Sequence, residues 1–286
     1  MTLVRDPVPP ADPRLTRAWR ATYDALTDRG DQVQCYGKAL AGVPQSLTRY
    51  RREVFRLLAE VALGRGALVL VAGTLGIIVF EVLAVGSVVG LVGYQGLKQV
   101  GIQPYVGFLS AYFNTREIAP LVAGLALSAT VGCGFTAQLG AMRINEEIDA
   151  LEVMGVPSLP FLVTTRIIAG FIAVVPLYVL GLLTSYFATR TIATQAYGQS
   201  TGTYDHYFNL FLPPEDVLWS FLKVLVFAVV IILTHCYYGY RASGGPAGVG
   251  MAVCGAVRFS IVAVNVIDLF LSLAIWGSST TVRIAG

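Results

Sequence analysis

The chain has 286 residues, of which 55% are hydrophobic and 13% are charged, and its mean hydropathy is +0.67. Soluble globular domains carry roughly 25% charged residues, so this composition excludes an ordinary soluble domain and indicates a polytopic membrane protein. The formal net charge is only +3, but eleven of the twenty Lys and Arg residues lie before residue 66. This asymmetry predicts a cytoplasmic N-terminus.

The N-terminal part of the chain divides into two segments. Residues 1–42 contain four prolines among scattered charges near their start, a composition that favours a flexible cytoplasmic tail. From residue 43 to about residue 64, apolar residues recur at helical spacing among arginines. This pattern predicts a basic amphipathic helix that lies in the membrane interface.

Five apolar stretches follow, each long enough to cross about 30 Å of hydrocarbon as a helix. They cover about residues 67–92, 118–141, 167–188, 217–240 and 259–282. The sequence therefore predicts an all-α membrane protein with polar connections outside the cytoplasm at 95–115 and 189–216. The polar segment at 143–157 and a glycine-rich turn at 241–250 would be cytoplasmic, and the C-terminus would be extracytoplasmic.

Ionisable side chains inside the spans are candidate functional residues, because a charge in hydrocarbon is costly. Glu81 lies at the midpoint of the first span, and it is either a cavity or proton-relay residue or a carboxyl that is neutral or paired. Asp268 in the fifth span is the second possible relay residue. Lys223 lies near the outer end of the fourth span, where it can extend its ammonium group to the membrane surface. His235, in the same span, is expected to form a hydrogen-bonded helix contact.

The second span carries small residues at every fourth position. The row consists of Gly124, Ser128, Gly132, Thr136 and Gly140. Rows of this kind allow two helix backbones to approach closely in lipid. We therefore predict that this row is a helix-packing face and not a ligand-binding site.

Residues 143–157, RINEEIDALEVMGVP, form a compact polar segment between the second and third spans. We predict one short helix with two faces over residues 143–155. The apolar stripe holds Ile144, Ile148, Leu151 and Met154, and the opposite side holds Glu146, Asp149 and Glu152. Glu147 lies on the flank of the stripe. Such a helix can dock in the groove of a partner, with the apolar stripe inside and the charges setting its orientation.

Several kinds of catalytic site are missing from the sequence. No G-x-x-x-x-G-K-[ST] phosphate loop occurs, so ATP that drives this protein would be hydrolysed by another subunit. The acids of 146–152 have no neighbouring histidine, which favours a solvated acidic face over a metal site. His206 and His235 are predicted on opposite sides of the membrane, and no G-x-S-x-G motif occurs, which argues against a hydrolase. We expect no catalytic, metal-binding or cofactor-binding residue in this chain.

Two stretches resemble the signature regions of one family. They are REIAPLVAGLALSATVGCGFTAQLGAMRINEEIDALEVMGV at residues 116–156 and CYYGYRASGGPAGVG at residues 236–250. Both are similar to the MlaE/YrbE permeases, the membrane subunits of ABC transporters that work with MCE-domain lipid-binding proteins. A looser similarity runs from about residue 49 to the end. The extended basic N-terminus is most similar to the actinobacterial YrbE branch, in which two different YrbE proteins pair.

The resemblance implies an interfacial helix, five membrane helices, and a coupling helix at 143–155 that docks on a cytoplasmic ABC ATPase. It also implies a second YrbE-type permease, ATP and Mg bound by the ATPase, MCE-domain proteins on the outer face, and lipid as cargo. No nucleic-acid partner is expected. The residues expected to contact the ATPase are Ile144, Glu146, Glu147, Ile148, Asp149, Leu151, Glu152, Met154 and Gly155.

These observations support the hypothesis of a non-catalytic permease subunit in the cytoplasmic membrane that moves hydrophobic lipid, such as fatty acid, sterol or phospholipid. Glu147 is the leading candidate for a charge-assisted contact with the ATPase. One alternative is a proton-coupled secondary transporter that uses Glu81 and Asp268 as relay acids. Another is a structural anchor that only holds MCE proteins at the membrane.

Overall fold

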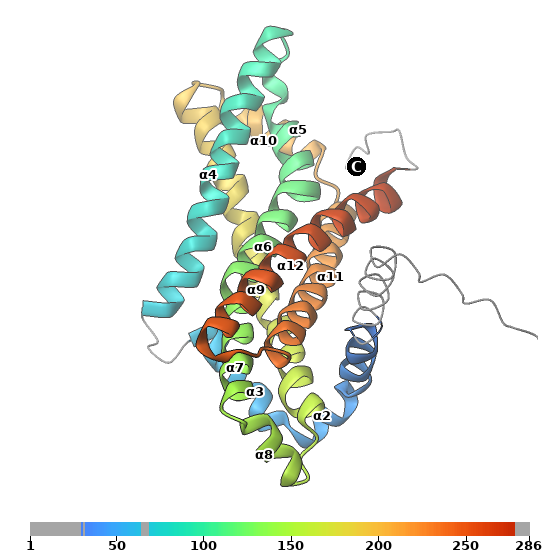
Figure 1. Ribbon diagram of the computed structural model, residues 1–286. Coiled ribbons are helices and arrows are strands. Elements are labelled where there is room, and N and C mark those ends of the chain that lie inside the picture. The colour runs from blue at the N-terminus through green and yellow to red at the C-terminus, as the bar shows by residue number, and fades with distance from the viewer. Residues whose placement is uncertain (1–29, 31, 64–68, 278–286) are drawn as a thin grey trace, which may run out of the picture.

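The computed structural model describes residues 30, 32–63 and 69–277, and this part of the chain contains helices and no strand. Five helical stretches within it are long and apolar enough to cross a membrane. They are Gly76–Gln99, Gln103–Ile144, Leu159–Ala196, Pro214–Tyr240 and Gly245–Trp276. The prediction of an all-α membrane protein with five spans is confirmed, and Figure 1 shows the long helices side by side.

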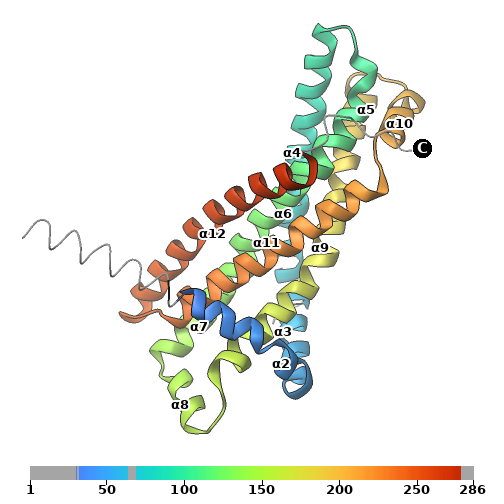
Figure 2. The same cartoon turned by 90° about the vertical axis from the view of Figure 1, so that its right-hand side faces the viewer.

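The bundle has a central group of helices and two peripheral ones. Most of the core comes from α6 (Ala119–Leu127), α7 (Cys133–Ile144), α9 (Thr165–Thr191) and α11 (Pro214–Tyr240). On the periphery, α4 (Val69–Gln99) packs against α9, and α12 (Gly245–Trp276) packs against α11 and α7 (Figures 1 and 2). Both peripheral helices expose large apolar side chains, such as Phe80 and Phe270. Such faces suit contact with lipid or with another membrane subunit.

The second and third spanning stretches are longer than the sequence predicted. The second has 42 residues and the third has 38, which at 1.5 Å per residue correspond to about 63 Å and about 57 Å. Each includes segments of π-helix, in which the hydrogen bonds skip one more residue than in an α-helix. These segments are η2 (Ser110–Ile118), η3 (Ser128–Gly132), η4 (Leu159–Thr164) and η5 (Ile192–Ala196). Both stretches therefore extend beyond the hydrocarbon layer.

Residues 95–115, expected as a polar connection between two spans, are almost entirely helical. α4 continues to Gln99, and η1 (Gln103–Tyr105) and α5 (Val106–Leu109) start the next helix. This segment, at the end of the bundle opposite α8, packs against α10 (Thr201–Leu210). Gly107 allows the approach, because a Cβ there would lie 2.3 Å from the backbone oxygen of Tyr204. The expectation was wrong because packing of aromatic and small residues, and not apolar periodicity, stabilises these turns.

The fifth span starts fourteen residues earlier than predicted, at Gly245. The glycine-rich turn expected over 241–250 occupies only residues 241–244. Gly244 and Gly245 both have positive φ, 86° and 72°, a conformation that glycine adopts without steric cost. These two residues reverse the chain, so the remaining glycines of the stretch can lie within the first turns of α12.

The N-terminal region is more ordered than a flexible tail over residues 1–42 would be. Residues 32–41 are helical, and Ala39 is fully buried and accepts a hydrogen bond at 2.8 Å from Thr164 Oγ1 through its carbonyl. The interfacial helix predicted at 43–64 is two helices, α2 (Val43–Arg49) and α3 (Arg51–Leu63), separated at Tyr50. Residues 1–29 lie outside the described residues.

Candidate functional site

The predicted helix over residues 143–155 is interrupted. α7 ends at Ile144, and α8 (Glu147–Val153) begins after Asn145 and Glu146. Glu146 has a φ of 61° and is the non-glycine residue with positive φ in the described chain. This left-handed residue cannot continue a right-handed helix, so the single-helix prediction was wrong. Figures 1 and 2 show α8 protruding at the end of the bundle opposite α5 and α10.

The interruption separates the members of the predicted apolar stripe. Ile148 is completely buried in the main core, and Leu151 packs partly buried against that core. Ile144 ends α7 and is half-buried. Met154, in contrast, is 69% exposed, and its neighbour Val153 is 89% exposed. Ile148 therefore holds α8 to this chain and does not present an apolar surface to a partner, which corrects its assignment as an ATPase contact.

The outward surface of α8 combines acids with a small apolar tip. Its exposed residues are Glu146, Glu147, Asp149, Ala150, Glu152, Val153, Met154 and Gly155. Arg143 Nη1 pairs with Asp149 Oδ1 at 2.6 Å and ties α8 back to the end of α7. Glu147 lies at the first residue of α8, where Asn145 Nδ2 donates to its carboxylate at 3.5 Å. We call this exposed surface the α8 face.

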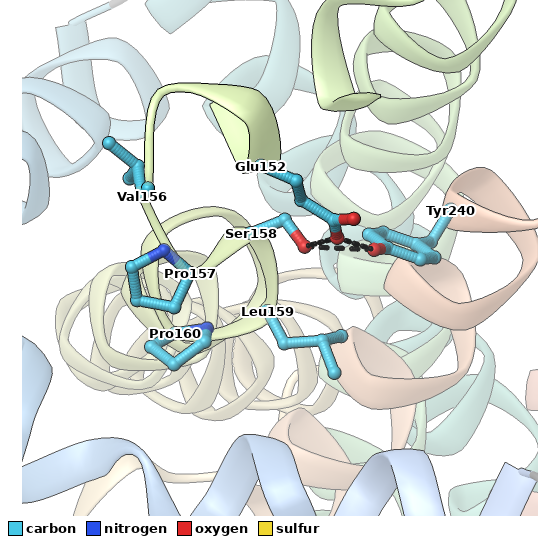
Figure 3. Close-up of a pocket in the computed structure, with 8 residues that line it drawn as sticks. Glu152, Val156, Pro157, Ser158, Leu159, Pro160 and Tyr240 are labelled. Atoms are coloured by element: carbon cyan, nitrogen blue, oxygen red, sulfur yellow. Dashed lines mark hydrogen bonds between the residues drawn. The ribbon is translucent and has the colours of Figure 1, made fainter. Parts of the chain in front are cut away.

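A cavity of about 650 Å³ lies between α8, the following loop and the C-terminal end of α11. It is lined by Glu152, Gly155, Val156, Pro157, Ser158, Leu159, Pro160 and Tyr240 (Figure 3). On one wall, Ser158 Oγ donates to Glu152 Oε1 at 2.6 Å and lies 2.9 Å from the Tyr240 hydroxyl. The opposite wall is apolar and includes Pro157 and Pro160.

The small residues of the second span lie against α11 and α12. A Cβ on Gly132 would come within 2.7 Å of His235 Cδ2, and one on Gly140 within 2.8 Å of Val249 Cγ1. Gly124 faces Phe227 and Val264. Every glycine of the row thus meets a side chain of another helix, as close packing in lipid requires.

His235 forms a buried hydrogen-bonded contact with the other two members of the row. Its Nδ1 lies 2.8 Å from Thr136 Oγ1, and its Nε2 lies 3.1 Å from Ser128 Oγ and 3.3 Å from Ser260 Oγ. Both ring nitrogens of this imidazole therefore have hydroxyl partners from α12 or the second span. The expectation that His235 is a hydrogen-bonded helix contact is confirmed.

A cluster of buried charges joins the second, fourth and fifth spanning stretches toward the end of the bundle opposite α8. Lys223 is 0% exposed, and its Nζ lies 2.7 Å from Asp268 Oδ1 and 2.8 Å from Ser272 Oγ. Nearby, Arg116 pairs with Asp216 at 2.6 Å, and Trp276 Nε1 donates to the same carboxylate at 2.9 Å. The expectation that Lys223 can extend to the membrane surface was wrong, because its ammonium group is satisfied inside the protein by the Arg116 carbonyl at 2.7 Å, the Ser272 hydroxyl and two acids. Glu117 is the second acid, at 3.4 Å.

Sequence reasoning missed Arg116, Glu117 and Asp216 as members of this cluster. A usable signal was present, because Asp216, Ser220 and Lys223 follow i, i+4, i+7 spacing and share one face of α11. The proposed relay acids are not brought together. Glu81 is half-buried on α4, which packs against α9, whereas Asp268 on α12 pairs with α11.

A profile of one protein family matches most of the chain. The profile of the permease MlaE aligns with residues 63–274. The chain belongs to the MlaE permease family. Within this family match lie the α8 face, the small-residue row and the buried charge cluster, whereas the helix at 32–41 and α2 precede it. Membership and five apolar helices together make this MlaE-family permease a multi-pass membrane protein.

Three known proteins are similar to this chain. A probable ABC transporter permease protein of Rickettsia bellii is 30% identical over 172 residues, which cover 60% of this chain and 66% of that protein. TRIGALACTOSYLDIACYLGLYCEROL 1, a chloroplastic protein of Arabidopsis thaliana, is 28% identical over 200 residues, covering 70% and 57%. The intermembrane phospholipid transport system permease protein MlaE of Haemophilus influenzae is 27% identical over 203 residues, covering 71% and 78%. The alignments thus span less than two thirds of the first two relatives.

Proposed function

We propose that this protein is the membrane subunit of an ATP-driven lipid transporter and that the α8 face is its contact with a cytoplasmic ABC ATPase. The observation that carries the proposal is α8 itself, a short helix that protrudes from one end of the bundle with exposed acids and an exposed apolar tip. Adjacent exposed apolar side chains on a protruding helix, here Val153 and Met154, suit a surface that binds a partner. The names of two relatives support an ABC transporter and a phospholipid cargo.

The chemistry of the α8 face suggests how the ATPase is recognised. Met154 and Val153 would enter an apolar groove, and Glu147 would accept a charge-assisted hydrogen bond from a basic side chain at its rim. Ile148 and Leu151 would hold α8 to the core, so that a displacement of α8 moves the helices on which it rests. ATP and Mg would be bound by the ATPase alone.

The same proposal includes the orientation of the chain in the membrane and the positions of its other partners. With α8 in the cytoplasm, the N-terminus is cytoplasmic, the C-terminus is extracytoplasmic, and α5 and α10 form the outer end, where MCE-domain proteins would dock. A second YrbE-type permease would pack against this one in the cytoplasmic membrane. Lipid would move through a cavity between the two permeases, whose walls would come from exposed apolar helix faces such as that of α12.

The docking surface can be tested by reversing its charge and polarity. We expect Glu147→Lys and Met154→Asp each to reduce the amount of ATPase that co-purifies by about tenfold. The first places a positive charge against a basic side chain of the ATPase, and the second places a charge in its apolar groove. Lys98→Glu is the matched control and should retain the ATPase, because Lys98 is an exposed residue at the C-terminal end of α4, away from α8. Membrane levels of all variants should equal that of the unchanged protein.

Two results would contradict this function. Unchanged co-purification and unchanged lipid uptake in both α8 variants would remove the docking role. Uptake that persists after ATP depletion but stops when the proton gradient is collapsed would instead support a secondary transporter. In that case Glu81→Gln should abolish uptake, whereas the ATP-driven mechanism predicts little effect.

A further inference from the structure

α11 has no direct chain connection to α8, in contrast to α7 and α9. α8 follows α7 after two residues and precedes the third spanning stretch by a short loop. The inner end of α11 lies 88 residues away from Glu152 in the sequence. Nevertheless, Tyr240, the last residue of α11, reaches the C-terminal part of α8 and the loop after it (Figure 3).

The hydrogen bonds at this contact have a defined direction. A serine hydroxyl has one proton, and Ser158 Oγ lies 2.6 Å from the Glu152 carboxylate, which only accepts when it is ionised. Ser158 therefore donates to Glu152. The Tyr240 hydroxyl then donates its own proton, either to Ser158 Oγ at 2.9 Å or directly to Glu152 Oε1 at 3.3 Å. The contact with Ser158 is the shorter of the two, which favours a chain from Tyr240 through Ser158 to Glu152, an arrangement in which successive hydrogen bonds strengthen one another.

The surroundings of this hydrogen-bonded chain differ from one end to the other. Ser158 is buried and Tyr240 is half-buried, so water competes weakly for their hydroxyls, whereas Glu152 is exposed. The adjacent cavity of about 650 Å³ leaves part of the loop without packing, although Leu159 packs against the core and Ser46 Oγ donates to the Pro160 carbonyl at 2.9 Å. The three polar side chains are therefore a direct side-chain connection between α8, the loop after it and the last residue of α11.

We infer that Tyr240, Ser158 and Glu152 form a latch that positions α11 relative to α8, so that movement of α8 is passed to the fourth span as well as to the second and third. The inference rests on the proposed docking of an ATPase at α8. These three are positioning residues, because none of them needs to touch ATP or lipid.

The rest of α11 shows where such a movement would arrive. The helix has 27 residues, about 40 Å of continuous backbone. It carries His235, with its hydroxyl partners, and then Lys223 and Asp216, which pair with Asp268 and Arg116. A shift of Tyr240 at the inner end would therefore act on the buried charge cluster at the outer end.

The test uses the full permease with its ATPase in lipid nanodiscs. Hydrogen–deuterium exchange is followed at residues 236–246 with and without ATP, which requires no knowledge of the cargo. We expect ATP to change exchange there in the unchanged protein, and Tyr240→Phe and Ser158→Ala to reduce that change at least fivefold while the ATPase stays bound. The variant carrying both substitutions should respond like either single variant, because both break one chain of hydrogen bonds.

Tyr238→Phe is the matched control, because it removes a hydroxyl from the same helix end but lies outside the latch, with its ring beside Phe259 and Gly255. It should keep the full ATP response. A second readout is the transfer of NBD-labelled phosphatidylethanolamine per ATP hydrolysed, which should fall about fivefold in Tyr240→Phe at a nearly unchanged hydrolysis rate. A purely structural role would instead lower thermal stability and leave this ratio intact.

The outcomes separate the latch from the proposed function. If ATPase co-purifies but Tyr240→Phe retains the full response at residues 236–246, the latch is wrong and the proposed function stands. An equal loss in Tyr238→Phe, or no ATP response in the unchanged protein, also overturns the latch. If no ATPase binds the unchanged protein, the proposed function fails, and the latch fails with it.

Discussion

The two ends of the bundle treat charge in opposite ways. At the α8 end, Glu146, Glu147 and Asp149 are exposed to solvent. Toward the opposite end, Lys223 and Asp268 are paired inside the protein with the Arg116–Asp216 pair beside them. Exposed charges contribute little to folding and are accessible for recognition, whereas removal of one partner from a buried pair is strongly destabilising. Burial therefore decides which purpose the same residue types serve.

Removal of a buried cation should give the largest effect. We expect Lys223→Met to lower the free energy of unfolding by about 3–5 kcal/mol, because Asp268 would stay buried without its partner. Thermal unfolding and monodispersity in detergent measure this. Adding Asp268→Leu should restore much of the loss, because two apolar side chains then replace the pair. If Lys223→Met alone were as stable as the unchanged protein, burial of charge would not distinguish the two ends of the bundle.

A smaller loss is expected between the two ends, in the small-residue row. Gly132→Ala should lower the free energy of unfolding by about 1–3 kcal/mol, because its Cβ would meet the His235 ring at 2.7 Å. Gly134→Ala is the control on the same helix, since nothing lies within 4 Å of its Cβ position. Alanine at that site should be neutral or slightly stabilising. Equal thermal stability of the two variants would contradict this account of the row.

The smallest effect should come from an exposed pair at the outer end, which separates burial from location. Arg190 holds the pKa of Asp205 below its ordinary value of 3.8 through a hydrogen-bonded ion pair. Because the pKa of Asp205 is depressed in the folded state, the ion pair stabilises the folded protein above about pH 3.8. This contribution is lost as the pH falls through the folded-state pKa. Both side chains are nearly half exposed, so Asp205→Asn should cost at most about 1 kcal/mol.

Melting temperatures at several pH values check this expectation. The deficit of Asp205→Asn should be constant between pH 5 and pH 7 and should disappear in more acidic solution. A deficit as large as that of Lys223→Met would show that position at the outer end, and not burial, determines the effect.

The sequence predicted the features that depend on local periodicity. Five spans follow from apolar length, the close approach at Gly132 follows from four-residue spacing, and the polar character of α8 follows from its acids. It failed where tertiary contacts decide. The break at Glu146 depends on one left-handed residue, and the burial of Lys223 depends on Asp268, 45 positions away in the sequence.

The contact between Tyr240 and Glu152 is a further tertiary feature that the sequence did not predict. Tyr240 lies in one family-like stretch and Glu152 in the other, so both were visible in the sequence without any sign that they touch. Their contact requires the inner end of α11 to reach the loop before α9. Similarly, residues 95–115 were predicted as a connection because apolar residues do not recur at helical spacing around Gly107. The segment nevertheless packs tightly against α10.

The helix at residues 32–41 has a practical consequence for experiments on this protein. It precedes the region matched by the family profile, yet Ala39 is part of the main core and Tyr36 packs edge-to-face against Tyr237 on α11. Ala39 also supplies the acceptor for the buried hydroxyl of Thr164. A shortened chain cut at the family boundary would therefore open the interior at the same end as α8. Truncation studies should therefore retain residues 32–63.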